Sequence, residues 1–320
     1  VLPLWKELAA TGRVELSTTP WQHPILPLVL DTDVAHRAQP HARLPTRFSW
    51  PEDAAMHVDR AMETFTRVFG APPSGMWPAE GSVGPEAAAL FASRGLKWIA
   101  TDEGILARSL GRAVGEDLFH PWRLDTPSGP ISLLFRDRTL SDRLGFVYAK
   151  SPPKDAAADA LKHLHGVARH TPAPEARSPT VAVILDGENA WEHYPDHGGP
   201  FLDALYVALS DPSVETITAS EAVAVPGRKL ERLATGSWID SNFRIWIGHP
   251  EDNLAWNLLG KVRAAWQKHA DAADVPAERL ASAREHLLVA EGSDWFWWYG
   301  DDFETANAVE FDLLFRTRLQ

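Results

Sequence analysis

Hydrophobic positions in the first two thirds of the chain follow two different spacings. Between residues 53 and 69, apolar side chains recur every three or four residues, and Gly70 follows the last of them. This spacing predicts an amphipathic helix that ends at the glycine. Residues 181–185 are instead continuously apolar, which is typical of a short strand buried on both faces of a sheet. Both kinds of element are therefore expected in one fold.

The two patterns alternate along the chain. Further strands are expected at residues 14–17, 97–101, 131–135 and 214–218, and further helices at residues 85–94, 154–169 and 201–209. Strand–helix alternation over about 220 residues favours a parallel sheet with helices outside it, either open or closed into a barrel. The predicted fold class is therefore α/β.

The strand pattern fades after about residue 226. Residues 250–270 and 276–290 have helical spacing, and an aromatic segment, Trp295-Phe296-Trp297-Trp298-Tyr299, follows them. We therefore predict a barrel-type domain at residues 1–225 and a helical subdomain at residues 226–320 that packs against it.

Charge and cysteine content exclude several classes of protein. The 320 residues include 31 basic and 43 acidic side chains, a formal net charge of −12, and no cysteine. Such a chain lacks the basic footprint of a nucleic-acid-binding protein and has no disulfides, zinc–thiolate sites or cysteine nucleophile. Its apolar runs are too short to cross a bilayer, and no signal peptide is recognisable. We expect no nucleic-acid or membrane partner and favour the cytoplasm, and we leave the oligomeric state open.

Tryptophan is the outlier in the composition, with 14 residues against 4 tyrosines. An indole ring offers a broad apolar face and one N–H donor, which suits a wet surface that contacts a partly apolar partner. Sugar rings fit that description, because their C–H faces lie flat on indole. Packing in the core is the alternative interpretation for any single tryptophan.

Polar or glycine-rich loops follow five of the expected strands, one of which ends at Met76. In barrel enzymes, the C-terminal ends of the strands and the loops after them carry the chemistry. The sequence therefore predicts one functional face, built from the loops that begin at Thr18, Trp77, Asp102, Arg136 and Asp186.

Two acidic residues in these loops suit the cleavage of a glycosidic bond. Glu80 lies in Trp77-Pro78-Ala79-Glu80-Gly81, and Asp186 begins Asp186-Gly187-Glu188-Asn189-Ala190-Trp191-Glu192. In glycoside cleavage one carboxylate attacks the anomeric carbon or activates water, and the other protonates the leaving oxygen. Apolar surroundings raise the pKa of the second group to suit that task. Loop capping and surface charge are the alternative interpretation for any pair among 43 acidic residues.

Several segments, in order along essentially the whole chain, resemble glycoside hydrolase family 57, which acts on α-glucans. Residues 15–24 are similar to its second motif, and Met76-Trp77-Pro78-Ala79-Glu80 to its third. Residues 186–192 are similar to the fourth motif, and Gly236-Ser237-Trp238-Ile239 to the fifth. Residues 135–142, 247–253 and 291–302 are most similar to the amylopullulanase branch.

This resemblance implies an incomplete (β/α)7 barrel followed by a helical subdomain. It also implies retaining action on starch, glycogen or pullulan, at α-1,4 linkages and with α-1,6 linkages as a further candidate. Glu80 would be the nucleophile and Asp186 the general acid/base, with their carboxyl groups about 5–5.5 Å apart. The substrate-binding candidates are His23, Trp77, Asp137, Trp191 and Trp238. Hydrolysis and transglycosylation both remain open.

One departure concerns the family's first motif, a His-x-His followed by Gln-Pro, which is absent. The only His-x-His is His163-Leu164-His165, inside an expected helix, and we interpret it as an exposed pair. We therefore expect a chain that is truncated at its N-terminus, lacks the first barrel strand and has weak or no activity alone. A non-catalytic α-glucan-binding domain is the alternative function.

A metal-dependent polysaccharide deacetylase is a further alternative. Asp31, Asp33 and His36 lie close together in the sequence, and a divalent ion held by such groups would activate water. A solvated loop is the favoured interpretation of this segment. We predict no metal site and no cofactor; family members bind calcium, but no ligand set in this sequence places it.

Overall fold

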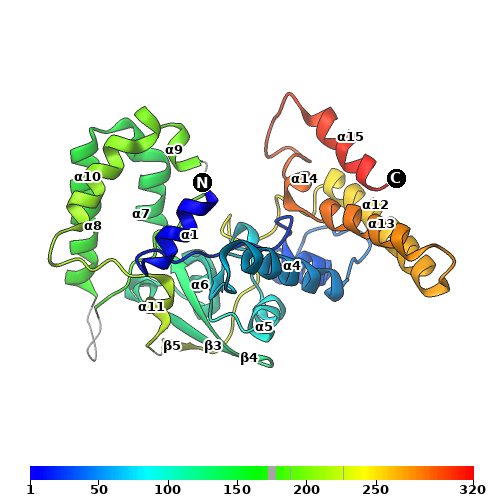
Figure 1. Cartoon of the computed structure of the whole chain (residues 1–320), viewed down its shortest axis with the longest axis horizontal. Coiled ribbons are helices and arrows are strands. Elements are labelled where there is room, and N and C mark those ends of the chain that lie inside the picture. The colour runs from blue at the N-terminus through cyan, green and yellow to red at the C-terminus, as the bar shows by residue number, and fades with distance from the viewer. Residues whose placement is uncertain (172–177, 188, 226) are drawn as a thin grey trace.

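Five strands form one sheet low in the view of Figure 1, in a computed structural model that describes the chain except for residues 172–177, 188 and 226. The order across the sheet is β1 (Gly75–Met76), β2 (Trp98–Asp102), β4 (Gly129–Arg136), β3 (Trp122–Thr126) and β5 (Arg228–Leu230). Strands β1, β2 and β4 run parallel, whereas β3 is antiparallel to β4 and parallel to β5. Parallel strands bring their carboxyl ends to the same edge of a sheet.

Two isolated bridges extend this sheet. Thr18 bridges to Met76 beyond β1, and Ala182 bridges to Arg136 at the end of β4, both in parallel. The sheet formed by the described residues is open, not closed into a complete barrel. The predicted α/β class is confirmed.

The strands expected at residues 14–17, 181–185 and 214–218 are not formed. The segment around Ala182 makes one bridge instead of a ladder, because the N–H of Ile184 donates to the Ser141 hydroxyl instead of to a neighbouring strand. Val183 is 40% exposed. The prediction that both faces of this segment are buried was therefore wrong.

The long helices agree with the sequence pattern. Helix α4 buries Ala54, Val58 and Ala61, and it ends at Gly70 in the left-handed conformation, with a φ of 89°. The helices are α1 (Leu2–Ala10), α2 (Leu26–Leu30), α3 (Ala35–Ala38), α4 (Pro51–Phe69), α5 (Pro85–Ser93), α6 (Glu103–Leu110), α7 (Arg138–Asp142), α8 (Pro153–His170), α9 (Asn189–Glu192), α10 (Gly199–Leu209), α11 (Ala219–Val223), α12 (Pro250–Ala272), α13 (Ala277–Ala290), α14 (Ser293–Trp297) and α15 (Ala308–Arg318). None of the helices in the described part of the chain has the length and apolar character needed to cross a membrane.

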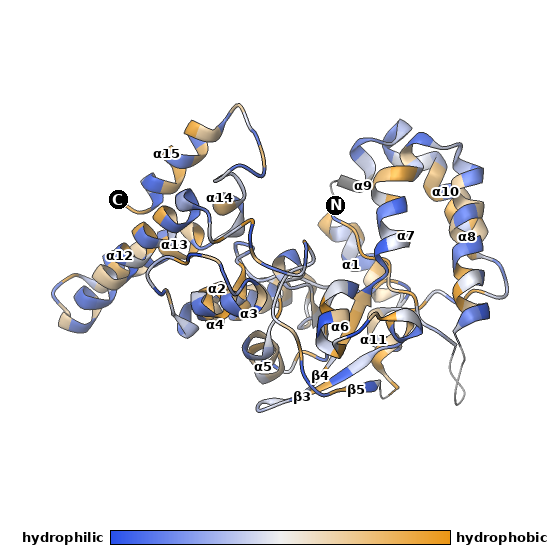
Figure 2. Cartoon of the chain, turned by 180° about the vertical axis from the view of Figure 1, so that it is seen from behind, coloured by the Kyte–Doolittle hydropathy of each residue, from blue (hydrophilic) through white to orange (hydrophobic). Residues whose placement is uncertain are grey.

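Two helical lobes rise from the sheet region, one formed by α7 to α10 and the other by α12 to α15 (Figure 1). Figure 2 shows that α12 and α13 mix hydrophobic and hydrophilic residues along their lengths. The first lobe has its own apolar cluster around Tyr148, Tyr194 and Phe201. Trp246 and Trp256 are fully buried in the main core, so part of the tryptophan excess is structural. Strand β5 adds to the sheet although it lies after residue 225, and the division at that residue stays a prediction.

A buried ionic cluster joins α4 to the second lobe. The guanidinium of Arg263 is fully buried and pairs with Asp53, with Nε 2.5 Å from Oδ2. It lies against the Trp50 ring at 3.8 Å and the Trp266 ring at 4.8 Å from the centroids. Arg284 donates to the same Asp53 carboxylate at 2.6 Å. Because removing one partner of a buried charge pair leaves the other uncompensated, this cluster fixes the two parts relative to each other.

Asp252, in the first turn of α12, makes the stability of the fold depend on pH. Its side chain is buried, and its Oδ1 atom has no hydrogen-bond partner among the described residues. Burial, with Asp302 and Glu251 nearby, raises the pKa of Asp252 to about 9. The pKa of Asp252 is higher in the folded than in the unfolded protein. Its contribution to the free energy of unfolding is therefore fully present below about pH 4 and is lost as the pH rises toward 9.

Replacement of Asp252 with asparagine is therefore expected to stabilise the protein at pH 8 by about 2 kcal/mol or more and to have little effect at pH 4. Urea unfolding at both pH values measures this difference. Asp155 is a matched control, since it occupies the same position in the first turn of α8 but is exposed. An equal effect of Asp252→Asn at the two pH values would contradict a protonated Asp252.

Candidate active site

The backbone of Glu80 is held in an unusual conformation just after β1. Glu80 has φ 55° and ψ 26°, in the left-handed region, which costs a non-glycine residue roughly 1–3 kcal/mol and is common at functional sites. The Trp238 N–H donates to the Glu80 carbonyl at 3.0 Å, and the Thr101 hydroxyl donates to the Gly81 carbonyl at 2.6 Å. Two neighbouring segments therefore hold this turn in place.

The Glu80 carboxylate has defined neighbours on both oxygens. The indole N–H of Trp238 donates to Oε2 at 2.8 Å, and Nδ1 of His23 lies 3.9 Å from Oε1. The Glu80 side chain is 16% exposed. Trp77 packs edge-on against Trp238, with ring centroids 5.2 Å apart. The carboxylate is thus oriented by the indole of Trp238, which in turn packs against Trp77.

Asp186 reaches the site from the segment beside β4. The side chain of Arg136, at the end of that strand, donates through Nε to the Ile184 carbonyl at 2.9 Å. The hydroxyl of Ser141 accepts from the N–H of Ile184 at 3.1 Å. These bonds fix the backbone two residues before Asp186. Glu188, in the same motif, lies outside the described residues.

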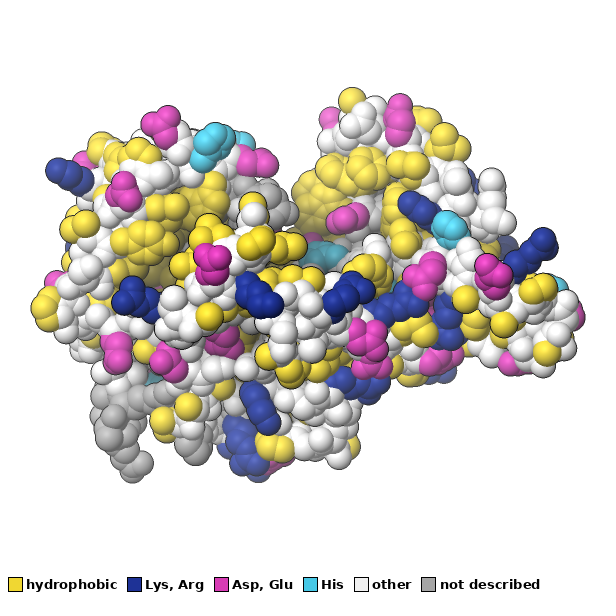
Figure 3. All heavy atoms as spheres, in the orientation of Figure 1, with side chains coloured by type: hydrophobic (Ala, Val, Ile, Leu, Met, Phe, Trp, Pro, Cys, Tyr) yellow, Lys and Arg dark blue, Asp and Glu magenta, His cyan; other side chains and the backbone are white. Residues whose placement is uncertain are grey.

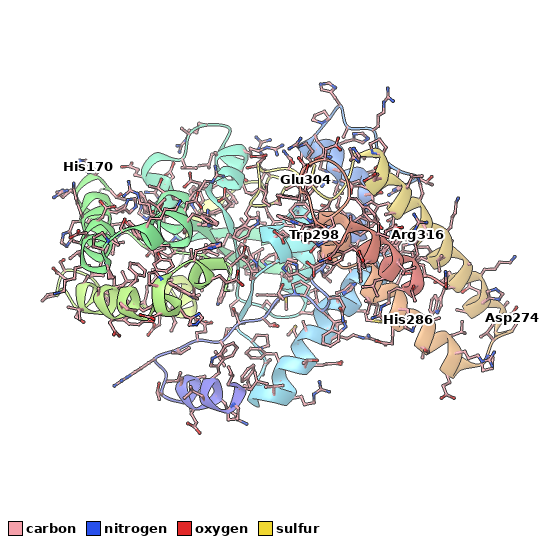
Figure 4. All side chains as sticks on the ribbon, turned by 90° about the horizontal axis from the view of Figure 1, so that it is seen from above. His170, Asp274, His286, Trp298, Glu304 and Arg316 are labelled. Carbon is pink, nitrogen blue, oxygen red and sulfur yellow. The ribbon has the colours of Figure 1, made fainter. Side chains whose placement is uncertain are left out.

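Glu80 and Asp186 line one large cleft of about 2630 Å³ between the two lobes. Figure 3 shows the hollow, with apolar side chains on the walls of both lobes. Viewed from above, Trp298 lies on the inner side of the helical lobe, whereas Asp274 is at its outer end (Figure 4). The cleft is also lined by His23, Trp77 and Trp238 from loops beside the sheet and by Trp297, Trp298 and Phe303 from the second lobe.

A charged network built around Arg136 lies behind Trp238. The guanidinium of Arg136 is 5.4 Å from the centroid of the Trp238 ring, and its NH2 is 2.5 Å from Asp142. Asp102, fully buried, accepts a hydrogen bond from Arg138 and lies 3.7 Å from Arg136. A cation against an indole face is attracted to it. The network therefore helps to fix the ring that donates to Glu80.

The structure keeps two of the expected substrate-binding residues away from the cleft lining. Asp137 is 2% exposed and is engaged by His163, whose Nε2 lies 2.6 Å away, and by the Leu140 N–H at 3.0 Å. Trp191 packs in the first lobe against Tyr194, with centroids 5.5 Å apart. The prediction that His163 is exposed was wrong, because its ring is only 17% exposed and faces Asp137.

Two of the three residues considered for a metal site, Asp31 and Asp33, have other partners. Arg47 donates to both oxygens of Asp31, at 2.9 and 2.6 Å, and Asp31 also caps the N–H of Asp33. The Arg47 guanidinium lowers the pKa of Asp31. Within the described ranges, no group of three His, Asp or Glu side chains is placed to hold a metal ion. No ligand set is therefore assigned to calcium.

Comparison with known proteins places this geometry in context. The model of glycosyl hydrolase family 57 matches residues 1–234. A search of curated proteins gave no match.

Three solved structures share the fold over 99% of this chain. A family 57-type branching enzyme from Pyrococcus horikoshii is 16% identical, with a TM-score of 0.73. The alpha-amylase AmyC from Thermotoga maritima is 15% identical, with a TM-score of 0.71, and a 4-alpha-glucanotransferase from Thermococcus litoralis is 16% identical, with a TM-score of 0.68. This chain spans 64%, 68% and 49% of their lengths, respectively. The likenesses confirm the predicted incomplete barrel followed by helices.

Proposed function

The chain belongs to glycosyl hydrolase family 57, and from this premise we propose that it acts on α-glucans by a retaining double displacement. Glu80 is the nucleophile and Asp186 the general acid/base. The proposed substrates are starch, glycogen and pullulan, with α-1,4 linkages as the first target and α-1,6 linkages as the second. One observation supports this assignment most directly: Glu80 and Asp186 lie 106 positions apart in the sequence and line the same cleft, whose walls contain several tryptophans.

In the first step, a carboxylate oxygen of Glu80 forms a bond to the anomeric carbon as the glycosidic C–O bond breaks. Asp186 gives its proton to the departing oxygen, so the leaving sugar is released as a neutral alcohol. The product is a β-linked glycosyl-enzyme. The indole N–H of Trp238 donates to Oε2 at 2.8 Å and stabilises the charge on Glu80 before the attack.

In the second step, Asp186 acts as a base on a water molecule or a sugar hydroxyl. The acceptor oxygen bonds to the anomeric carbon, its proton passes to Asp186, and the bond to Glu80 breaks. Two inversions leave the α configuration unchanged. The cleft extends between the two lobes and has room for either acceptor. Hydrolysis and transglycosylation therefore share this site in the proposed mechanism.

The indole rings supply the binding surface. Trp77 and Trp238 lie beside Glu80, and Trp297 and Trp298 line the same cleft from the second lobe. Flat C–H faces of glucose stack on such rings. We assign Trp77 and Trp238 to the sugar at the cleavage point, and the tryptophans of the second lobe to sugars further along the chain.

The stereochemistry of the first product tests this function. Proton NMR of a maltooligosaccharide digest is expected to show the α-anomer first, with the β-anomer appearing only as mutarotation proceeds. An initial β-anomer would contradict the double displacement. Binding of amylose without any new reducing ends or transfer products would instead identify a non-catalytic glucan-binding domain.

A further inference from the structure

His23 stands between Glu80 and a residue of the second lobe. Its Nδ1 atom lies 2.9 Å from the Ser293 hydroxyl and 3.9 Å from Oε1 of Glu80. Ser293 begins α14 and is 1% exposed. A buried hydroxyl 270 positions away in the sequence therefore contacts the imidazole that flanks the proposed nucleophile.

The backbone around Ser293 is clamped to the loop that carries His23. The Ser293 N–H donates to the His23 carbonyl at 3.0 Å, and Gly292 forms an antiparallel bridge with Pro24. A Cβ on Gly292 would lie 2.6 Å from the Gln22 carbonyl oxygen, so only glycine permits this approach. Gln22 and His23 both have positive φ, 61° and 54°. The loop thus adopts a strained conformation that the second lobe supports.

A buried pair, His57 and Glu291, supports this contact between the Ser293 segment and the His23 loop. Nδ1 of His57 lies 2.5 Å from the Trp21 carbonyl oxygen, which can only accept, so Nδ1 carries the proton. Burial lowers the pKa of His57 to about 4, and the ring is neutral at neutral pH. Its Nε2 atom, 2.8 Å from Oε2 of Glu291, must then accept a hydrogen bond. Burial and the nearby Asp53 carboxylate raise the pKa of Glu291, which favours a protonated carboxyl that can donate to this nitrogen.

We propose that Ser293 is a positioning residue of the active site, acting on Glu80 through His23. Its hydroxyl fixes the imidazole at Nδ1, so that the same edge of the ring faces the Glu80 carboxylate. The Glu291–His57 pair fixes the position of residues 291–293 relative to the loop that carries His23. This proposal rests on the proposed function, because it gives a role to a neighbour of the nucleophile.

Replacement of Ser293 with alanine tests the proposal. We expect kcat/KM on a maltooligosaccharide to fall by about 3- to 10-fold, the effect of one lost hydrogen bond. The acidic limb of its pH profile should also shift, because a released imidazole titrates differently beside Glu80. In a His23→Ala background, Ser293→Ala should cause no further change in kcat/KM, since the two residues act as a unit.

Ser109→Ala is the matched control. Ser109 is another buried serine whose hydroxyl bonds only to backbone groups in the described part of the chain, at Ile105 and Ala234. Its loss should lower stability and leave the pH profile unchanged. If Ser293→Ala does not fold, Ser293→Cys keeps the size and weakens the donor, and the same shift is expected.

The outcomes separate this proposal from the proposed function. A wild-type protein that turns over no α-glucan overturns the function. An active wild type with an unchanged Ser293→Ala pH profile, or additive effects with His23→Ala, overturns the role of Ser293. Nitrogen-15 NMR of the imidazole of His23 gives a readout independent of activity: its tautomer and pKa should change in Ser293→Ala and stay unchanged in Ser109→Ala.

Discussion

Replacement of Glu80 with alanine is expected to lower kcat on soluble starch by about 10⁴-fold or more, the scale of loss seen when a covalent nucleophile is removed. The carboxylate that should bond to the anomeric carbon is absent in this variant, and no other carboxylate contacts the indole N–H of Trp238 among the described residues. Reducing-sugar assays at saturating starch measure the loss. Glu80→Gln keeps the shape of the side chain and should show a loss of similar size.

Addition of azide to Glu80→Ala tests whether the missing carboxylate is the nucleophile. Azide can enter the space left in Glu80→Ala and attack the anomeric carbon in place of the carboxylate, giving a β-glycosyl azide with partial recovery of rate. Glu86→Ala is the control, because Glu86 is half exposed and pairs with Arg37 on the surface of α5. Near-normal turnover by Glu80→Ala, or an α-glycosyl azide, would show that Glu80 is not the nucleophile.

Helices and central strands were predictable because each buries one regular pattern of apolar residues. The helix expected at residues 53–69 is α4, and the strand expected at 131–135 lies within β4. Strand β3 was missed, although Trp122 and Leu124 are buried and Arg123 and Asp125 are exposed. That alternation is the pattern of an antiparallel strand with one covered face. A strand that pairs antiparallel at one side of the sheet is not expected from strand–helix alternation, which predicts parallel neighbours.

The position of the site was predictable for a topological reason. Segments that run parallel to the strands end at one edge of the sheet, even where they make only a single bridge, as at Thr18 and Ala182. The structure accordingly brings His23, Glu80 and Asp186 to a common cleft. The sequence pattern indicates much less about which of these side chains are already hydrogen-bonded or ion-paired to a neighbouring residue. Asp137 follows a strand like the others, yet its carboxylate is used by His163 and a helix N-terminus.

Long-range contacts could not be predicted from local patterns. Ser293 lies in the segment 291–302, whose family resemblance does not indicate what its hydroxyl contacts. Its contact with His23 depends on the second lobe being fixed against α4 by Arg263 and Asp53. Arg136 was expected near the site, but its place behind the Trp238 ring follows from the β4 edge and the loop around Glu80. Such relationships become visible only when segments from both ends of the chain are packed together.

Replacement of Asp186 with alanine is expected to affect substrates unequally. Loss of a general acid costs about 10²–10⁴-fold in rate, and we expect a loss of this size on soluble starch, whose leaving group is a poorly acidic sugar hydroxyl. An α-maltosyl fluoride needs no proton donor, because fluoride leaves unassisted. Its first step should therefore be slowed by less than about 10-fold, and the glycosyl-enzyme should accumulate since the base for the second step is missing.

Two measurements distinguish this role from a structural one. Mass spectrometry of Asp186→Ala treated with the fluoride should show a covalent adduct, and added azide should release it as an α-glycosyl azide, opposite in configuration to the product from Glu80→Ala. Asp203→Ala is the control, since Asp203 is an exposed residue of α10 in the same lobe. Equal losses on starch and on the fluoride would contradict proton donation by Asp186, because only a donor's loss depends on the basicity of the leaving group. The opposite configurations of the two azides are the stronger test, because they require the two carboxylates to act on opposite faces of one anomeric centre.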